Sequence, residues 1–388
     1  MISFLIVVVT ATLWALLTML AVHRTRRARS AHEARVSITP KESITILKPL
    51  CGVDNDLEKN LRSYFEQDHP RFEIIFGAGE GDPAIELVRR LRDEYEHVPS
   101  KLVIHDGARG LNPKVSNLRA MVELASHDII VISDSNIAVE SDYLASMQAD
   151  LARYGVGLVA SLACGVGEQT LGARLDNLQL NGPVAGGTAA ASRFLHHPAF
   201  AGKSMMFRRS IFDRLGGFSS VADVLAEDYV IGRMFHEAGY QVVLASQPVY
   251  NVCSRVTVDT FFQRHVRWGM IRLRMQPFAF VLEPLTNPLV VALVAPLFGV
   301  YGAAPLLWAV LLTIARDAST WTTLRGTQGL ARALPLFPLR DALMFVAWLV
   351  VPFRRHVTWR GNRVRVSAGT RLYPETVPRE PTLVLVEE

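Results

Sequence analysis

One basic cluster in the sequence could bind an anionic ligand. The stretch "FFQRHVRWGMIRLRMQPFAF" (261–280) places Arg264 and Arg267 three residues apart, with Trp268 beside them. Side chains three apart share a face of a helix, and two guanidinium groups on one face can hold phosphate oxygens through several donors. Basic residues that snorkel to a membrane surface would give the same pattern, so this segment alone leaves both interpretations open.

Four acidic residues are candidate functional carboxylates. Asp134 ends the apolar run "HDIIVISDSN", where a charged group is costly unless it is paired or bound to a metal. Asp82 precedes a proline, a common position for a helix cap. Glu227 and Asp228 begin a helical segment, where the helix dipole favours negative charge. Each acid, taken singly, therefore also has an ordinary structural explanation.

Alternating strands and helices are predicted to position these groups. The apolar runs are "SITILKPL", "FEIIFGAGEGD", "KLVIHD" and "HDIIVISDSN", and the amphipathic segments between them are "DNDLEKNLRSYFEQ", "PAIELVRRLRDEYE" and "NPKVSNLRAMVELAS". This alternation predicts an α/β fold with a parallel sheet covered on both faces. Ligands of such sheets bind at the carboxyl ends of the strands, and Asp82 and Asp134 fall there.

Apolar segments at both ends of the chain predict membrane helices. Residues 1–22 carry no charge and can span a bilayer; a cleaved signal peptide would need a preceding basic residue and a shorter apolar core. Residues 278–315, with one charge and four prolines, favour a hairpin of two short irregular helices. Residues 342–353 are a third candidate. Three crossings would put the arginine-rich tail outside, against the positive-inside rule, whereas one segment lying in the interface would remove the conflict.

The composition favours membrane association over nucleic-acid binding. Half of the 388 residues are apolar, the mean hydropathy is +0.21 and the net charge is +5. Much of the positive excess lies beside apolar segments, as in "HRTRRARSAHEAR" (23–35), where anionic headgroups attract it. The positive-inside rule places this segment and the domain after it in the cytoplasm. The three single cysteines form no CxxC pair and fit a reduced compartment.

The order of the motifs resembles one enzyme family. Asp82, Asp134, the pair Glu227–Asp228 and "RHVRW" are similar to the three spaced aspartates and the (Q/R)xxRW motif of membrane-bound, family-2-like glycosyltransferases with a GT-A fold. The segments "NPKVSNL", "ISDSN", "GKSMMFRR", "LAEDYVIGR" and "TWRGNRVRV" resemble ceramide glucosyltransferases and their bacterial relatives that glycosylate sphingolipids or hopanoids. The likeness is strong over residues 43–280 and loose over the membrane part.

The resemblance implies a domain organisation. The expected parts are a transmembrane anchor (1–22), a basic juxtamembrane linker (23–42), a cytoplasmic GT-A catalytic domain (43–276), C-terminal membrane helices (277–353) and a basic tail (354–388). The protein would then be an integral membrane protein, located in the inner membrane if its source is a bacterium. Within this scheme, the small residues of 178–195 could leave a groove for a lipid chain or form a loop packed on the membrane.

The resemblance also implies the nucleotide side of the site. Pro49 and Asp82 would lie against the uridine, and Lys114 and Asn117 would line the nucleotide. Asp134 would meet the diphosphate through a divalent cation, Mg²⁺ or Mn²⁺. The usual DxD motif is replaced here by Asp-Ser-Asn at 134–136. Because asparagine is a neutral oxygen ligand, the metal affinity should be weaker or depend more on water and substrate phosphates.

The remaining implied roles concern the transfer step. Asp228 would be the general base, and Glu227 would belong to the UDP-sugar site. Arg264 and Arg267 would hold the departing UDP, with Trp268 fixing their segment.

The favoured function is inverting transfer of a hexose from a UDP-sugar, by preference UDP-glucose, to the hydroxyl of a membrane lipid, by preference ceramide. The alternatives are a hopanoid N-acetylglucosaminyl transferase using UDP-GlcNAc, a processive polysaccharide synthase, and a sugar-nucleotide sensor or small transporter. The C-terminal region is short for a polymer channel, and a transport path would need more polar residues within the spans. The expected partners are a UDP-sugar, a lipid acceptor and the bilayer, without nucleic acid.

Overall fold

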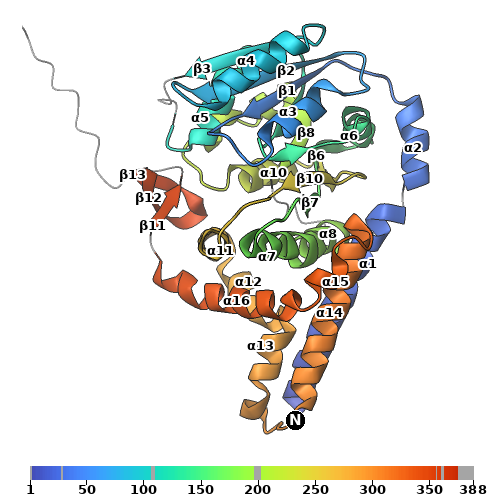
Figure 1. Ribbon diagram of the computed structural model, residues 1–388, viewed down its shortest axis with the longest axis vertical. Coiled ribbons are helices and arrows are strands. Elements are labelled where there is room, and N and C mark those ends of the chain that lie inside the picture. The colour runs from blue at the N-terminus through green and yellow to red at the C-terminus, as the bar shows by residue number, and fades with distance from the viewer. Residues whose placement is uncertain are drawn as a thin grey trace, which may run out of the picture.

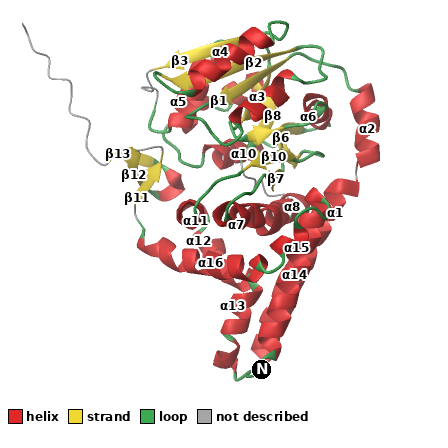
Figure 2. Ribbon diagram, viewed as in Figure 1, coloured by secondary structure: helices red, strands yellow, loops and turns green. Residues whose placement is uncertain are grey.

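The computed structural model describes residues 2–27, 29–105, 110–195, 202–354, 356–359 and 362–374. An α/β domain lies at one end, and a stem of helices that contains the N-terminus projects from it (Figure 1). Figure 2 shows the strands gathered in the α/β domain and the helices forming the stem. Residues 375–388 of the predicted basic tail lie outside the described residues.

A seven-stranded sheet forms the centre of the α/β domain. Its order is β3 (Ser100–His105), β2 (Phe72–Gly79), β1 (Ile44–Pro49), β4 (Ile129–Ser133), β8 (Ser204–Arg208), β6 (Val156–Ala160) and β9 (Gln241–Leu244). The first four strands in this order are parallel to one another, as predicted, and β8 runs antiparallel to both of its neighbours. The fold is therefore an α/β fold with a mostly parallel sheet.

Helices cover both faces of this sheet. One face packs on α3 (Leu57–Phe65), α4 (Ala84–Glu94) and α6 (Tyr143–Leu151), the other on α5 (Pro113–Val122), α9 (Arg209–Arg214) and α10 (Glu227–Glu237). Alternate side chains of a strand point to opposite faces. Ile46 accordingly joins the first apolar cluster and Leu47 the second. Burial on both faces explains why the strands read as unbroken apolar runs.

A smaller sheet lies beside the carboxyl end of β4. It consists of β5 (Ile137–Ala138), β10 (Val249–Val252) and β7 (Ala163–Val166). After β7 the chain continues through α7 (Leu171–Gln179), a π-helical turn (Leu180–Val184) and α8 (Ala185–Phe194). The segment 178–195 is thus helical, and the predicted loop is wrong there. Pro183 lies inside the π-helical turn, at the point where the regular helix is interrupted.

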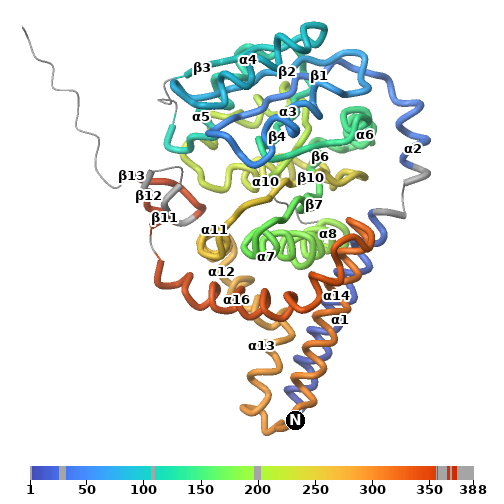
Figure 3. Tube along the Cα trace, viewed as in Figure 1, coloured from blue at the N-terminus to red at the C-terminus, as the bar shows by residue number. Residues whose placement is uncertain are grey.

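The helical stem combines both ends of the chain. The helices α1 (Ile2–Arg27), α13 (Pro288–Leu293) and α14 (Ala304–Arg325) pack together, with α1 also against α8 (Figure 3). The predicted hairpin of 278–315 is present, although α14 extends ten residues further, to Arg325. Two helical stretches, Ile2–Thr25 and Leu336–Phe353, are long and apolar enough to cross a membrane.

The helix α16 (Leu336–Val350) runs across the stem and does not lie along it (Figure 1). It packs against α7, α14 and α11 (Val258–Met275). After it, β12 (Asn362–Val366) and β13 (Leu372–Pro374) return to the α/β domain, where Val366 and Leu372 pack against Leu225 and Val266. This part of the tail therefore packs on the α/β domain.

Buried ion pairs join α14 to α16. Arg316 contacts Asp317 at 2.7 Å and Asp341 at 3.2 Å, and Arg340 contacts Asp341 at 3.0 Å and forms a further ion pair with Asp317. All four side chains are buried. These two basic and two acidic groups lie just outside the apolar segments 278–315 and 342–353, and their charges cancel.

Candidate active site

Asp134 lies at the carboxyl end of β4 between two lysines. Its Oδ1 is 2.9 Å from Nζ of Lys114, and its Oδ2 is 3.2 Å from Nζ of Lys203. Burial alone would raise the pKa of Asp134, but the two ammonium groups outweigh it and hold the pKa below its usual range. Asp134 is therefore a charged, partly accessible carboxylate, as its position after an apolar strand suggested.

Lys114 connects Asp134 with the predicted acid pair. It stands in the first turn of α5, a helix capped by the Asn112 side chain, and its Nζ lies 3.0 Å from Glu227 Oε1. Burial opposes a charged lysine, yet Asp134, Glu227 and Asp228 together raise its pKa. Burial also raises the pKa of Glu227, with Lys114 acting against it. Two predicted acids thus share one buried cation.

Asp228 is held by backbone groups and is half-buried. Its Oδ2 accepts a hydrogen bond from the backbone N–H of Gly202 at 2.6 Å, and its Oδ1 accepts from the N–H of Tyr229 at 2.8 Å. A Cβ atom at position 202 would lie 2.1 Å from Cβ of Asp228, so this close approach requires glycine. The carboxylate is fixed at the start of α10, and no side-chain cation of the described residues forms an ion pair with it.

The RxxRW helix, α11, meets α7 through a buried carboxylate. Arg264 forms an ion pair with Asp176, and Nε2 of His265 lies 3.1 Å from the other oxygen of Asp176. The ring of Trp268 contacts the edge of the His265 ring, with a centroid distance of 5.2 Å. Burial lowers the pKa of His265, although Asp176 opposes this effect. The neutral imidazole and the carboxylate together orient Arg264.

A small cavity joins this helix to the Asp134 group. Its volume is about 20 Å³, and it is lined by Asp176, Leu180, Lys203, Asn251, Arg264, His265 and Trp268. Lys203 reaches both parts of the site, since it contacts Asp134 and also lines the cavity. Of the two predicted arginines, Arg264 lines this cavity and Arg267 does not.

The residues predicted to face the uridine lie at the ends of β1 and β2. Pro49 is the last residue of β1. Asp82 accepts hydrogen bonds from the backbone N–H groups of Ala84 and Gly52, both at 2.8 Å, so it caps α4 and also holds the turn after β1. Asn117 is buried and donates to the carbonyls of Leu50 and Gly77.

Four residues of the site were missed by sequence reasoning. They are Lys48, Asp176, Lys203 and His265. Lys203 stands in "GKS", which lacks the glycine spacing of a phosphate loop, and its position directly before a strand was the available signal. Lys48, within β1, donates to the backbone carbonyl of Asp134 at 2.6 Å, and burial lowers its pKa to about 7. Nothing in the sequence around Asp176 distinguishes it from an ordinary helical aspartate.

The oxygen donors at Asp134 could supply only part of the ligands of a divalent cation, because both carboxylate oxygens also contact lysines. Among the residues that the structure describes, no group of three or more His, Cys, Asp or Glu side chains forms a complete metal cage. Mg²⁺ commonly binds one or two carboxylates and takes its other ligands from phosphates and water. Asp134 offers one such carboxylate, and the Asn136 amide donates its N–H to Asn251 at 3.1 Å, which leaves its own oxygen available.

The fold and the site together define a class of enzyme. A mostly parallel sheet with charged side chains converging beyond its strand ends is the architecture of nucleotide-binding α/β enzymes. A family model described as Glycosyl transferase family 21 matches residues 4–372. The chain belongs to this glycosyltransferase family, as the sequence motifs had suggested.

Several ceramide glucosyltransferases are similar in sequence. Ceramide glucosyltransferase 3 of Caenorhabditis elegans is 30% identical over 246 residues, which cover 63% of this chain and 53% of the relative. Ceramide glucosyltransferase 1 of the same organism is 27% identical over 347 residues, covering 85% and 72%. The enzyme of Komagataella phaffii is 29% identical over 305 residues, covering 63% and 60%. The chain thus spans only about half the length of the first of these relatives.

Solved structures show a more distant similarity. The mannosyltransferase PcManGT from Pyrobaculum calidifontis, in complex with GDP-Man and Mn²⁺, has a TM-score of 0.48 at 20% identity, covering 88% of this chain and 99% of its own. S. aureus TarS 1–349 in complex with UDP-GlcNAc has a TM-score of 0.38 at 10% identity, covering 86% and 99%.

Proposed function

We propose that this protein is an inverting, membrane-bound glycosyltransferase that moves a hexose from a UDP-sugar to the hydroxyl group of a lipid. One observation carries the proposal: Lys203 contacts Asp134 and also lines the cavity that Arg264 and Trp268 of the RxxRW helix enclose. Groups from distant parts of the chain therefore surround one position where a diphosphate would be neutralised by cations from two sides.

Asp228 is the proposed general base. It removes the proton from the lipid hydroxyl while the lipid oxygen attacks the anomeric carbon from the face opposite to the leaving group. The bond from that carbon to the diphosphate oxygen breaks, and UDP leaves. A positioned carboxylate of this kind contributes about 10²–10⁴-fold. The backbone N–H of Gly202 fixes one oxygen of Asp228, which holds the base in a single orientation.

The cations of the site are proposed to stabilise the departing UDP. Lys203 and Arg264 face the same cavity, and Arg267 belongs to the same helix. Preorganised donors aimed at developing negative charge contribute about 3–4 kcal/mol each in known oxyanion sites. Asp134, with the Asn136 oxygen, would hold Mg²⁺ or Mn²⁺, which supplies further positive charge at the diphosphate.

The nucleoside is proposed to lie beside the ends of β1 and β2. Pro49 and Asp82 would contact the uridine there, with Asn117 supporting the two strand ends through Leu50 and Gly77. Lys114 and Glu227 would complete the UDP-sugar site next to Asp134. Trp268 would fix the arginine-bearing segment through its contact with His265.

The proposed membrane arrangement is supported by the helical stem, whose α1 is long and apolar enough to cross a membrane. The proposed parts are an anchor (1–22), a linker (23–42), a cytoplasmic catalytic domain (43–276), membrane helices (277–353) and a tail (354–388). The similarity to ceramide glucosyltransferases favours ceramide as the acceptor and UDP-glucose as the donor. In bacteria such a protein would belong to the inner membrane.

Product analysis tests this function directly. Purified protein in lipid nanodiscs would receive UDP-glucose, UDP-galactose or UDP-GlcNAc together with ceramide or a hopanoid, and mass spectrometry would identify the product. We expect one hexose on ceramide, with inverted anomeric configuration from UDP-glucose. Transfer of a single N-acetylglucosamine to the hopanoid would show that the donor is UDP-GlcNAc and the acceptor a hopanoid. A chain of sugars would indicate a polymer synthase. Binding of UDP-sugar without any product would contradict the enzymatic proposal.

A further inference from the structure

A second cavity lies on the far side of α7 from the candidate active site. Its volume is about 80 Å³, and its lining includes Glu168, Arg174, Leu178, Trp321, Arg332 and Leu336. On this measure a single water molecule needs about 10–15 Å³, so the cavity has room for a group larger than one water, such as a small tetrahedral anion. It is lined by residues of α7, α14, α15 (Leu330–Ala333) and the start of α16, and it opens to the surface, where Arg332 is exposed.

The geometry of α7 separates this cavity from the active site. Asp176 and Leu180, four residues apart, face the cavity with Arg264. Arg174 and Leu178, also four apart, face the second cavity. Successive helical residues are rotated by about 100°, so pairs offset by two residues point in nearly opposite directions. A ligand in the second cavity is therefore distinct from the sugar donor.

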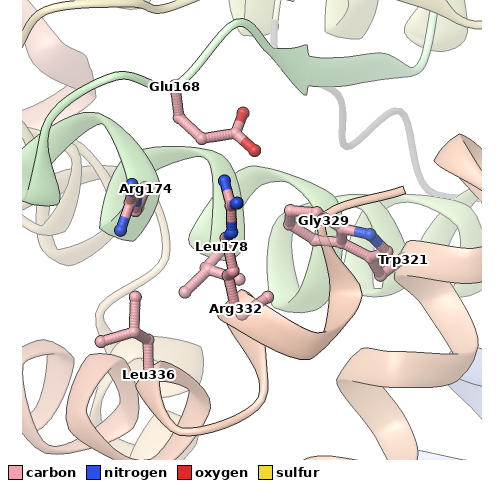
Figure 4. A pocket seen from close by; sticks show the side chains of 8 residues that line it. Glu168, Arg174, Leu178, Trp321, Gly329, Arg332 and Leu336 are labelled. Atoms are coloured by element: carbon pink, nitrogen blue, oxygen red, sulfur yellow. The ribbon is translucent and has the colours of Figure 1, made fainter. Parts of the chain in front are cut away.

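Two guanidinium groups in this cavity have no counter-ion. Within the described part of the chain, Arg174 and Arg332 take part in no side-chain hydrogen bond or ion pair. Glu168 is already neutralised by Arg325 at 3.0 Å. Figure 4 shows the guanidinium groups of Arg174 and Arg332 above the side chains of Leu178 and Leu336. The cavity thus combines two uncompensated positive charges with an apolar floor.

The cavity lies at one end of α14, which packs along α1, a helix long and apolar enough to cross a membrane. The first half of α14 exposes Leu306, Leu307 and Leu311, each by more than half of its surface. Its other end carries Trp321 and Arg325, whose guanidinium lies 4.2 Å from the Trp321 ring centre. Tryptophan and basic residues are enriched where membrane helices meet the headgroup layer. Basic pockets between membrane helices at this level bind anionic headgroups.

We propose that this cavity binds the phosphate of an anionic membrane phospholipid, with Arg174 and Arg332 as its two ligands. The phosphate bridges α7 of the catalytic domain to α15 of the membrane part, and the acyl chains leave over the apolar side chains toward the stem. Guanidinium groups suit this role because each can donate two parallel hydrogen bonds to phosphate oxygens. This site goes beyond the proposed glycosyl transfer and does not depend on it.

Lipid binding to the full-length protein tests the site without any enzyme assay. Delipidated protein in detergent would be titrated with phosphatidylglycerol, phosphatidylcholine or inorganic phosphate, and bound lipid counted by native mass spectrometry. We expect phosphatidylglycerol to bind most tightly, and R174Q/R332Q to weaken it by about tenfold or more for each arginine, the effect of losing a hydrogen bond to a charged group. The matched control is R89Q, which removes one exposed arginine on α4.

A conservative pair covers the case in which R174Q/R332Q does not fold. In R174K/R332K the charges remain but the forked donors are lost, so phosphatidylglycerol should bind more weakly than in the unchanged protein. The proposal would be overturned if phosphatidylglycerol and phosphatidylcholine bound equally well. It would also be overturned if neither R174Q/R332Q nor R174K/R332K changed the binding of phosphatidylglycerol. Saturation of the site by inorganic phosphate at the same concentration as the lipid would overturn the lipid assignment in favour of a free anion.

Discussion

Asp176 on α7 forms an ion pair with Arg264 on α11, and the same carboxylate receives His265 at 3.1 Å. Burial alone would raise the pKa of Asp176, but His265 and Arg264 bring it below the usual value. The carboxylate is therefore charged, and it points one arginine of the RxxRW motif into the cavity that Lys203 shares. Asp176 acts through Arg264, as a positioning residue.

Replacement of Asp176 by asparagine should misplace this arginine. Because a hydrogen bond to a charged group is worth about 1.5–3 kcal/mol, we expect D176N to lower kcat/KM for the UDP-sugar by about tenfold or more. The restored carboxylate in D176E should recover part of the loss. Thermal melting of each variant separates this effect from unfolding. Unchanged kcat/KM in a folded D176N protein would show that Arg264 needs no such support.

Asp228→Asn tests the general base. We expect transfer to fall by about 10²-fold or more, while binding of the UDP-sugar, measured by calorimetry, stays within a fewfold of the starting value. Asparagine can still accept the N–H of Gly202 but not also that of Tyr229, so thermal melting accompanies the assay to show that the variant folds. D213N, an exposed change on α9, is the matched control and should keep full activity. An active D228N enzyme would exclude Asp228 as the base.

Removal of divalent cations tests the role of Asp134. Since a catalytic metal contributes several kcal/mol, treatment with EDTA should lower turnover by roughly 10²-fold, and Mn²⁺ or Mg²⁺ should restore it. With one protein carboxylate in the donor set, the cation should bind much more tightly when UDP-sugar is present. D134N should lose the response to added metal. Full turnover in EDTA would mean that Lys114 and Lys203 neutralise the diphosphate alone.

Lys48 predicts a pH dependence of stability. Its pKa falls from 10.5 to about 7 on folding because the ammonium group is buried. Between these two values the unfolded chain holds a proton that the folded chain does not, so stability rises with pH across this window and is lost as the pH falls toward 7. We therefore expect the melting temperature of the unchanged protein, relative to that of K48M, to rise as the pH increases from 7 to 10.5. K59M, which removes an exposed lysine of α3, should follow the unchanged protein.

The buried ion pairs between α14 and α16 predict a large loss of stability in D317N. Arg340 would then lie buried with one partner fewer, and removal of one member of a buried pair costs about 3–5 kcal/mol. Unfolding measured at increasing concentrations of a denaturing detergent gives this loss of stability. The double variant D317N/R340M removes both charges and should be more stable than D317N. If the two variants unfold alike, the pair contributes no specific stabilisation.

Much of the architecture could be predicted from local patterns. Unbroken apolar strands separated by amphipathic helices indicated the parallel sheet, because burial on both faces leaves a continuous apolar signal. The same rule placed Asp82 and Asp134 at strand ends, where they are found. The apolar residues 1–22 predicted α1 in the same way.

The pairing of charges was decided only by the tertiary structure. Lys114, Asp134 and Glu227 lie far apart in the sequence and meet because β4 ends, and α5 and α10 begin, at one edge of the sheet. Asp176 and Arg174 look alike as charged residues of one short helix, yet one supports the candidate active site and the other faces the second cavity. The sequence determines which groups carry charge, whereas helix rotation and packing determine which charges meet, since Coulomb interactions depend on distance in space and not along the chain.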